Sequence, residues 1–125
     1  MTLPVGDVER SVAFYRAALV DGMGWVEREV EGAPTFGPEG AEDVSLVAGG
    51  PLRPAIHLAF AATDFAQVEG FHRAGLAAGG RDNGAPGPRP KYSPGYHGAF
   101  LLDPDGHNVE AVWHAPTGEV ADIAG

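Results

Sequence analysis

The segment Asp7–Leu19 reads DVERSVAFYRAAL, and the segment Asp64–Leu76, 57 positions later, reads DFAQVEGFHRAGL. Five of the thirteen aligned positions are identical without a gap, namely those of Asp7, Phe14, Arg16, Ala17 and Leu19. Two amphipathic helices with similar caps could also converge on such matches. Each segment, however, follows a short apolar run and precedes strand-like pieces separated by Gly. Self-similarity at a fixed offset therefore predicts one structural unit that occurs twice.

Both segments have the pattern of a capped amphipathic helix. Asp7 and Asp64 can accept hydrogen bonds from the free amides of a first turn, and Gln67 nearly completes a capping box with Asp64. Apolar side chains recur at helical spacing in both segments: Val8, Val12, Tyr15 and Leu19 in the first, and Phe65, Val68 and Phe71 in the second. The sequence predicts helices near residues 7–20 and 64–78.

The remaining segments have the pattern of strands: Thr2–Val5, Trp25–Val30, Thr35–Phe36, Val44–Ala48, Ala55–Ala61, Gly98–Leu102 and Asn108–His114. The Gly80–Tyr96 stretch is rich in Pro and Gly and predicts at most a weak strand. Asp103–Gly106 reads DPDG between two apolar runs and predicts a hairpin turn. The order is βαβββ twice, an α+β fold in one domain over residues 1–125, with module one at 1–50 and module two at 54–115.

The amino-acid composition argues against several classes of protein and partner. Apolar residues make up 44% of the 125 residues, and no run approaches the roughly 18 that a membrane span needs. The chain has no Cys, which excludes disulfides and thiolate metal sites. Seventeen acidic and eight basic residues leave a net charge of -9, which argues against nucleic acid and anionic lipid as partners. We expect a cytoplasmic protein, because no basic segment followed by an apolar run opens the chain.

Two residues on different predicted strands are candidate metal ligands. His57 shares a strand face with Ala59 and Ala61, whose small side chains leave space beside an imidazole. Glu110 lies in the middle of an apolar strand, where a buried carboxylate must be paired, protonated or bound to a metal. Together they would supply two ligands of a two-His, one-carboxylate site. The simpler readings are a His with one hydrogen bond and a Glu that faces water.

The offset of 57 places the counterpart of His57 at position 0, one residue before Met1. We therefore expect that Met1 is a mis-assigned start and that a His precedes it. Other candidates are weaker. We expect His107 to be a solvated turn residue, His72 to pack in the core, and His114 to lie near a strand end on the face of Glu110. The acidic residues between Glu27 and Asp43 are expected to form a solvated face.

Three segments resemble the vicinal oxygen chelate superfamily, which contains glyoxalase I, extradiol dioxygenases and bleomycin-resistance proteins. They are Leu3–Tyr15 (LPVGDVERSVAFY), Ile56–Leu58 (IHL) and Phe100–Glu110 (FLLDPDGHNVE). The resemblance implies two βαβββ modules that form an open, cup-shaped, barrel-like mixed sheet around a metal. It also implies that His57 and Glu110 are metal ligands, with Glu110 catalytic, and that the chain forms a homodimer.

The resemblance leaves two functions open. One is a metal-dependent lyase, isomerase or dioxygenase that holds Fe, Mn, Ni or Zn and binds a small substrate through neighbouring oxygens. The other is a metal-free small-molecule binding protein, for which the net charge of -9 would suit a cationic guest. Val44–Ala48 lacks the Glu that glyoxalase-like members carry on the fourth strand. Tyr92, Tyr96 and His97, in a loop rich in Pro and Gly, are expected to contact the substrate.

Overall fold

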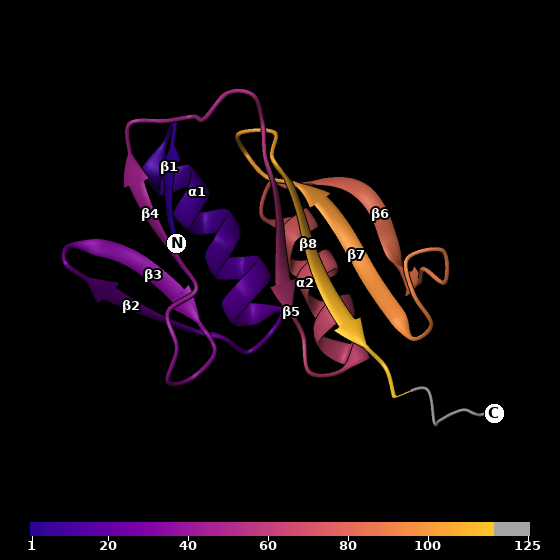
Figure 1. Ribbon diagram of the computed structural model, residues 1–125. Coiled ribbons are helices and arrows are strands. Elements are labelled where there is room, and N and C mark those ends of the chain that lie inside the picture. The colour runs from indigo at the N-terminus through magenta and orange to yellow at the C-terminus, as the bar shows by residue number, and fades with distance from the viewer. Residues whose placement is uncertain (117–125) are drawn as a thin grey trace.

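The computed structural model describes residues 1–116 and contains the βαβββ unit twice (Figure 1). The first module comprises β1 (Thr2–Val5), α1 (Val8–Tyr15), the π-helical segment η1 (Arg16–Asp21), β2 (Val26–Val30), β3 (Ala33–Gly37) and β4 (Val44–Ala48). The second comprises β5 (His57–Ala61), α2 (Phe65–Ala77), β6 (Arg81–Pro88), β7 (Tyr96–Leu102) and β8 (Asn108–His114). The predicted duplication is confirmed.

Each module folds its strands into a four-stranded mixed sheet with the same order. The first sheet runs β1-β4-β3-β2 and the second runs β5-β8-β7-β6. In each sheet the first strand pairs in parallel with the last, and the other pairs are antiparallel. The described residues therefore form two open sheets rather than a closed barrel. None of the helices within residues 1–116 has the length and apolar character needed to cross a membrane.

Strand β6 is the main difference from the sequence-based expectation. Eight residues of the Pro- and Gly-rich stretch form this strand, and five of them pair with residues of β7, with register shifts on both sides of Gly84. An edge strand accepts Pro because its outer amides need no partner in the sheet. Strand β7 begins at Tyr96 rather than Gly98, so Tyr96 and His97 belong to the sheet and not to the loop before it.

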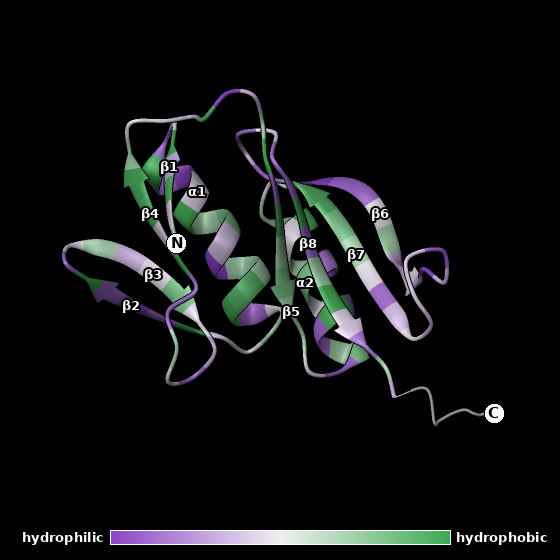
Figure 2. Cartoon of the chain, viewed as in Figure 1, coloured by the Kyte–Doolittle hydropathy of each residue, from purple (hydrophilic) through white to green (hydrophobic). Residues whose placement is uncertain are grey.

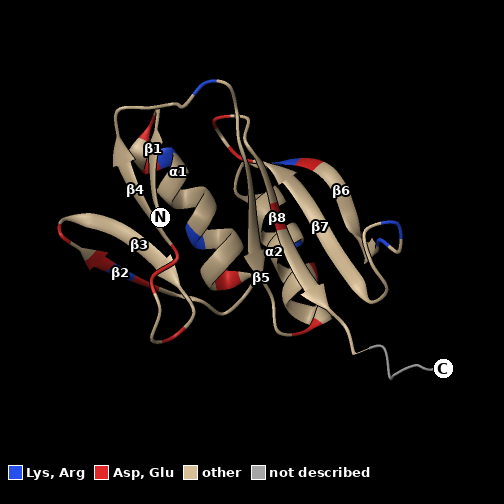
Figure 3. Cartoon of the chain, viewed as in Figure 1, with Lys and Arg blue, Asp and Glu red and all other residues tan. Residues whose placement is uncertain are grey.

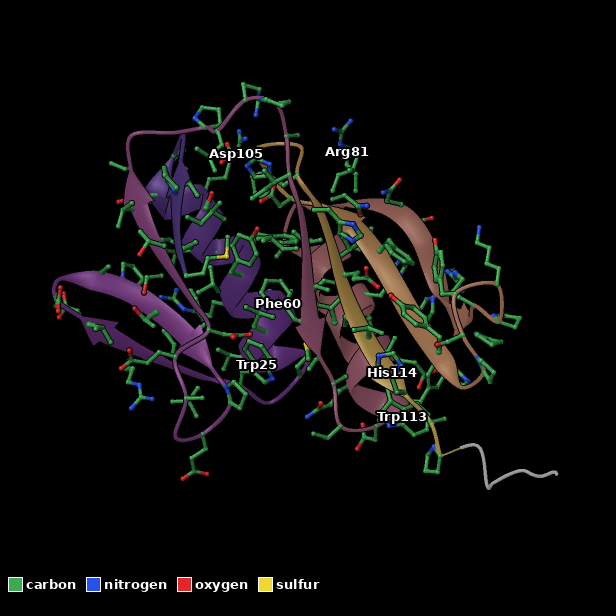
Figure 4. The ribbon with its side chains drawn as sticks, viewed as in Figure 1. Trp25, Phe60, Arg81, Asp105, Trp113 and His114 are labelled. Carbon is green, nitrogen blue, oxygen red and sulfur yellow. The ribbon has the colours of Figure 1, made fainter. Side chains whose placement is uncertain are left out.

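The core lies where the two modules meet, with both helices on one side of the sheets (Figure 1). Phe60 of β5 contacts aromatic rings from both modules, with ring centroids 6.3 Å from Tyr15, 5.7 Å from Trp25 and 6.4 Å from Phe71. Figure 4 shows Trp25 and Phe60 beside each other at this junction, and Figure 2 shows that β4, β5 and β7 are largely hydrophobic. This packing leaves one face of each sheet uncovered by helices.

The hairpin turn after β7 is tied to α1. Gly106 donates to the Asp103 carbonyl at 2.9 Å, which closes the predicted turn. The buried Asp103 carboxylate accepts from the Tyr15 hydroxyl at 2.5 Å and from the amides of Asp105 and His107 at 2.9 Å. Burial, and secondly the Asp103 charge, raise the pKa of Tyr15 well above its ordinary value. The first helix is therefore joined to the last hairpin by buried polar groups.

The prediction that His107 is a solvated turn residue is wrong. His107 is fully buried instead of solvated, and its Nδ1 accepts a hydrogen bond from the Ile56 amide at 3.0 Å. The ring fills the junction between the turn and the start of β5, which a turn read in isolation does not reveal. His72 is buried as predicted, and its Nε2 lies 2.9 Å from Asp82 Oδ1.

The N-cap of α2 carries a first testable prediction. Asp64 accepts from the Gln67 amide at 2.9 Å, while Gln67 Oε1 accepts from the Thr63 amide at 2.8 Å. Asp64→Ala should lower the free energy of unfolding by about 1 kcal/mol, because it removes the acceptor for a first-turn amide. Urea denaturation measures this loss. Asp64→Asn, which keeps an acceptor oxygen, should stay within about 0.5 kcal/mol of the parent, and equal losses in both variants would contradict the assignment.

Candidate functional site

The face of the second sheet that points away from the helices brings the main candidates together. Leu58, Phe60, Val109 and Ala111 pack into or against the core from the other face. Because side chains alternate along a strand, the intervening residues share the uncovered face. We call it the open face; its residues are His57, Ala59, Tyr96, Gly98, Phe100, Glu110, Val112 and His114.

His57 and Glu110 meet on the open face because β5 and β8 are parallel neighbours, with Ala59 opposite Glu110. His57 Nε2 lies 2.7 Å from Glu110 Oε1. The side chain of His57 is 52% exposed, whereas that of Glu110 is 4% exposed. The arrangement places a buried carboxylate beneath an imidazole that solvent and small molecules can reach.

Tyr96 completes the polar cluster. Its hydroxyl donates to Glu110 Oε2 at 2.5 Å, so both carboxylate oxygens have partners. Burial, and secondly this hydrogen bond, raise the pKa of Tyr96 above its ordinary value. The hydroxyl consequently keeps its proton at neutral pH and serves as a permanent donor to Glu110.

Gly98 packs closely against this cluster. A Cβ on Gly98 would lie 3.3 Å from Tyr96 Cε1, 3.5 Å from Phe100 Cε1 and 3.5 Å from Glu110 Oε2. A side chain at this position would therefore press on the rings of Tyr96 and Phe100 and on the Glu110 carboxylate.

Aromatic rings surround the polar cluster. The ring of Tyr96 packs edge-on against Tyr92 at 4.9 Å and against His114 at 5.2 Å between centroids. Tyr92 is 54% exposed, and the ring of Phe100 lies 6.3 Å from His57. Figure 4 shows His114 near the end of β8. The open face therefore offers apolar contacts around one carboxylate and one imidazole.

His97 lies apart from the other predicted ligand-binding residues. It follows Tyr96 directly in β7, so its ring points to the opposite face of the sheet. There it packs against Phe65 of α2 at 5.5 Å and against Trp113 at 5.2 Å between ring centroids. The expectation that His97 contacts the substrate beside Tyr92 and Tyr96 is therefore corrected: it is a packing residue between the sheet and α2.

Sequence reasoning missed Phe100, Gly98 and Arg89 as neighbours of the site. Phe100 is paired with Glu110 in the β7–β8 register, and Gly98 lies two residues before it. A strand assigned from Tyr96 onward would have placed both on the face of Glu110 by simple alternation. The guanidinium carbon of Arg89 lies 5.6 Å from the Phe100 ring centroid, a position with no signal in the sequence pattern.

The donor chemistry of His57 and Glu110 suits a divalent ion such as Zn, Mn, Fe or Ni. Their contact shows that an imidazole nitrogen and a carboxylate converge on one point of the open face. Within residues 1–116 no third His, Cys, Asp or Glu joins them in a ligand set. The two residues fit half of a metal site, and further donors must come from a ligand, water or another chain.

The first sheet offers a different surface at the equivalent place. A depression of about 430 Å³ lies over β1, β3 and β4, with Thr2, Ser45 and Val47 in its lining. The Ser45 hydroxyl is 2.7 Å from that of Thr35. As the sequence predicts, β4 brings no carboxylate to this face. Figure 3 shows acidic residues of the first module on β2, on the neighbouring loops and at the ends of its helical segment, whereas β5 and β7 carry no charge.

Comparison with known proteins gives a family match over most of the chain. The family model described as Glyoxalase/Bleomycin resistance protein/Dioxygenase superfamily matches residues 1–111. No curated protein sequence matches the chain.

Solved structures share the fold. A glyoxalase/bleomycin resistance protein from Albidiferax ferrireducens T118 is 27% identical with a TM-score of 0.72, over 90% of this chain and 93% of that chain. A glyoxalase-related enzyme from Fulvimarina pelagi is 22% identical with a TM-score of 0.64, over 90% and 84% of the two chains. The fosfomycin resistance protein FosX from Mesorhizobium loti is 21% identical with a TM-score of 0.66, over 97% and 94%.

Proposed function

Because the chain belongs to the glyoxalase/bleomycin resistance protein/dioxygenase superfamily, we propose that its open face binds a small molecule at a divalent metal ion held by His57 and Glu110. The superfamily includes glyoxalase-related enzymes and fosfomycin resistance proteins, which supports small-molecule binding. The observation that carries the proposal is the 2.7 Å contact between His57 Nε2 and Glu110 Oε1 on a face that no helix among residues 1–116 covers. We propose lyase, isomerase or dioxygenase chemistry on a substrate with two neighbouring oxygens.

Glu110, Tyr96 and His57 have different roles at the proposed site. Glu110 supplies negative charge from a buried position, where electrostatic interactions are stronger than in water. The Tyr96 hydroxyl holds Glu110 Oε2 and so fixes the carboxylate plane, as outer hydrogen bonds do for metal ligands. His57 is accessible from solvent and can change partner from Glu110 to an ion. A bound divalent ion would act as a Lewis acid on the oxygens of the substrate.

Metal-free binding of a small molecule is the second candidate, and one observation favours it. Both Glu110 oxygens already have hydrogen-bond partners, so the cluster is satisfied without an ion. In that case the aromatic rings around the cluster would contact the guest directly.

Titration with Mn²⁺, monitored by calorimetry and by electron paramagnetic resonance, distinguishes the metal-dependent function from metal-free binding. We expect one Mn²⁺ per chain, with Glu110→Gln and His57→Ala each weakening the affinity at least tenfold, which is about 1.4 kcal/mol. Glu29→Gln removes an exposed carboxylate of the first module and should bind Mn²⁺ like the parent.

Equal Mn²⁺ affinity in Glu110→Gln and the parent would refute the metal site and leave metal-free binding as the proposal. We also propose that the chain forms a homodimer and is located in the cytoplasm, as the sequence predicts. Superfamily proteins often form dimers, and the molar mass of the Mn²⁺-loaded protein in solution tests whether this chain does.

A further inference from the structure

Arg89 differs from every other basic residue of the chain. All eight lysines and arginines lie within residues 1–116, and seven of them are exposed. Arg89 alone is half-buried, in the segment after β6 that Figure 3 shows as a blue loop. A cation withdrawn from water requires compensating contacts, so its surroundings indicate what it does.

The backbone holds Arg89 in place. Its amide donates to the Tyr96 carbonyl at 2.7 Å, which ties it to the start of β7. Nη2 donates to the Ala85 carbonyl at 2.6 Å and Nη1 to the Pro88 carbonyl at 3.3 Å. The side chain therefore folds back along β6 in a fixed direction instead of extending into solvent.

Two glycines make room for this side chain. A Cβ on Gly84 would lie 3.4 Å from Arg89 Nη2, and a Cβ on Gly87 would lie 3.4 Å from Nη1. Gly84 pairs with Phe100 in the sheet, and the guanidinium carbon lies 5.6 Å from the centroid of the Phe100 ring. A guanidinium over an aromatic face is attracted by the negative face of the ring. The two glycines of β6 therefore allow the guanidinium to lie over the ring of Phe100.

The position over Phe100 is next to the proposed binding site. Phe100 is paired with Glu110 across β7 and β8, and its ring lies 6.3 Å from that of His57. Arg89 makes no ion pair with any carboxylate among residues 1–116. Two of its five N–H groups donate to carbonyls, which leaves three donors without a protein partner in the same range. The charge is fixed in place and unpaired at the edge of the open face.

We propose that Arg89 binds an oxyanion group, a carboxylate or a phosphate, of the small molecule that occupies the open face. The inference rests on the proposed function and adds the substrate class. A planar guanidinium with free donors matches the oxygens of such groups in a bidentate manner. A chain of net charge -9 repels anions over most of its surface, so an anionic ligand needs a fixed cation at the site.

The test titrates the ¹⁵N-labelled protein with sodium phosphate and, separately, with sodium acetate at constant ionic strength and pH. Chemical-shift changes of the Arg89 Nε–Hε signal and of the β7 amides report binding, and the two anions distinguish a phosphate from a carboxylate site. We expect saturable binding of at least one anion. Arg89→Met, which keeps an apolar contact with Phe100, should weaken it about tenfold, and Arg89→Lys, which keeps charge but not the planar fork, several-fold.

Arg81→Met is the matched control. Arg81 lies at the other end of β6 (Figure 4), where it lines, together with Arg10, a depression of about 290 Å³. We expect this variant to bind the anion like the parent, and thermal unfolding of each variant confirms that it is folded. The proposal is overturned if Arg89→Met binds as tightly as the parent, if Arg81→Met loses the binding instead, or if neither anion binds saturably.

The same titration on Glu110→Gln separates this inference from the metal site. Removing the neighbouring negative charge should leave anion binding at Arg89 equal to or stronger than that of the parent. Loss of Mn²⁺ binding in that variant with anion binding retained supports both proposals. Mn²⁺ binding unaffected by Glu110→Gln, with anion binding dependent on Arg89, would refute the metal site alone.

Discussion

Replacing Gly70 with Ala is expected to lower the free energy of unfolding by about 3 kcal/mol, although Ala is the better helix former by about 1 kcal/mol. Gly70 lies inside α2, where that helix touches the end of η1. A Cβ on Gly70 would lie 2.0 Å from the carbonyl oxygen of Gly22, and a Cβ on Gly22 would lie 2.4 Å from that of Gly70. The obstacle is backbone on both sides, so a side-chain rotation cannot relieve it.

Urea denaturation of Gly70→Ala measures this effect. Arg73→Ala, at an exposed position of the same helix, is the control and should stay within about 0.5 kcal/mol of the parent. The sign of the change is decisive. A gain in stability for Gly70→Ala would show that helix propensity outweighs the contact and that the modules do not approach as closely as the structure indicates.

Tyr15→Phe is also expected to lower the free energy of unfolding by about 3 kcal/mol, because it leaves a buried carboxylate oxygen without its donor. Tyr15 is fully buried and Asp103 is 3% exposed, so water does not replace the lost hydroxyl. The two residues are 88 positions apart and join the modules. The same removal of a hydroxyl from the exposed Tyr92 should change stability by less than about 0.5 kcal/mol.

A double-mutant cycle assigns the loss to the Tyr15–Asp103 pair. The free energies of unfolding of Tyr15→Phe, Asp103→Asn and the double variant give the coupling energy, which should be 1 kcal/mol or more for buried partners in contact. Additive losses would show that the two groups contribute independently and that the hydrogen bond does not hold the modules together.

The fold could be predicted because the sequence contains an internal repeat. Matching Asp7–Leu19 to Asp64–Leu76 predicted two modules, the positions of the helices and the βαβββ element order of each module. The placement of His57 and Glu110 on one face followed from alternation along two strands. Such inferences succeed when a regular period relates residues to a face of the sheet.

The errors arose where the chain is irregular or where contacts are distant in sequence. Reading the Pro- and Gly-rich stretch as loop concealed that Tyr96 and His97 lie in one strand and so face opposite ways. The burial of His107 depends on Ile56, which is 51 residues away. The path of Arg89 over Phe100 depends on glycines that look like ordinary turn residues in the sequence.

The bond between Tyr15 and Asp103 also governs the order in which a nascent chain can finish folding. A ribosome that adds about 5–20 residues per second needs roughly ten seconds to travel the 88 residues between them. Until β5 and α2 are synthesised, Phe14, Tyr15 and Leu19 have no second-module surface to pack against. Asp103 becomes available to Tyr15 only after Phe60 and Phe71 have been synthesised, so the buried polar contact between the modules forms after their aromatic rings can already meet.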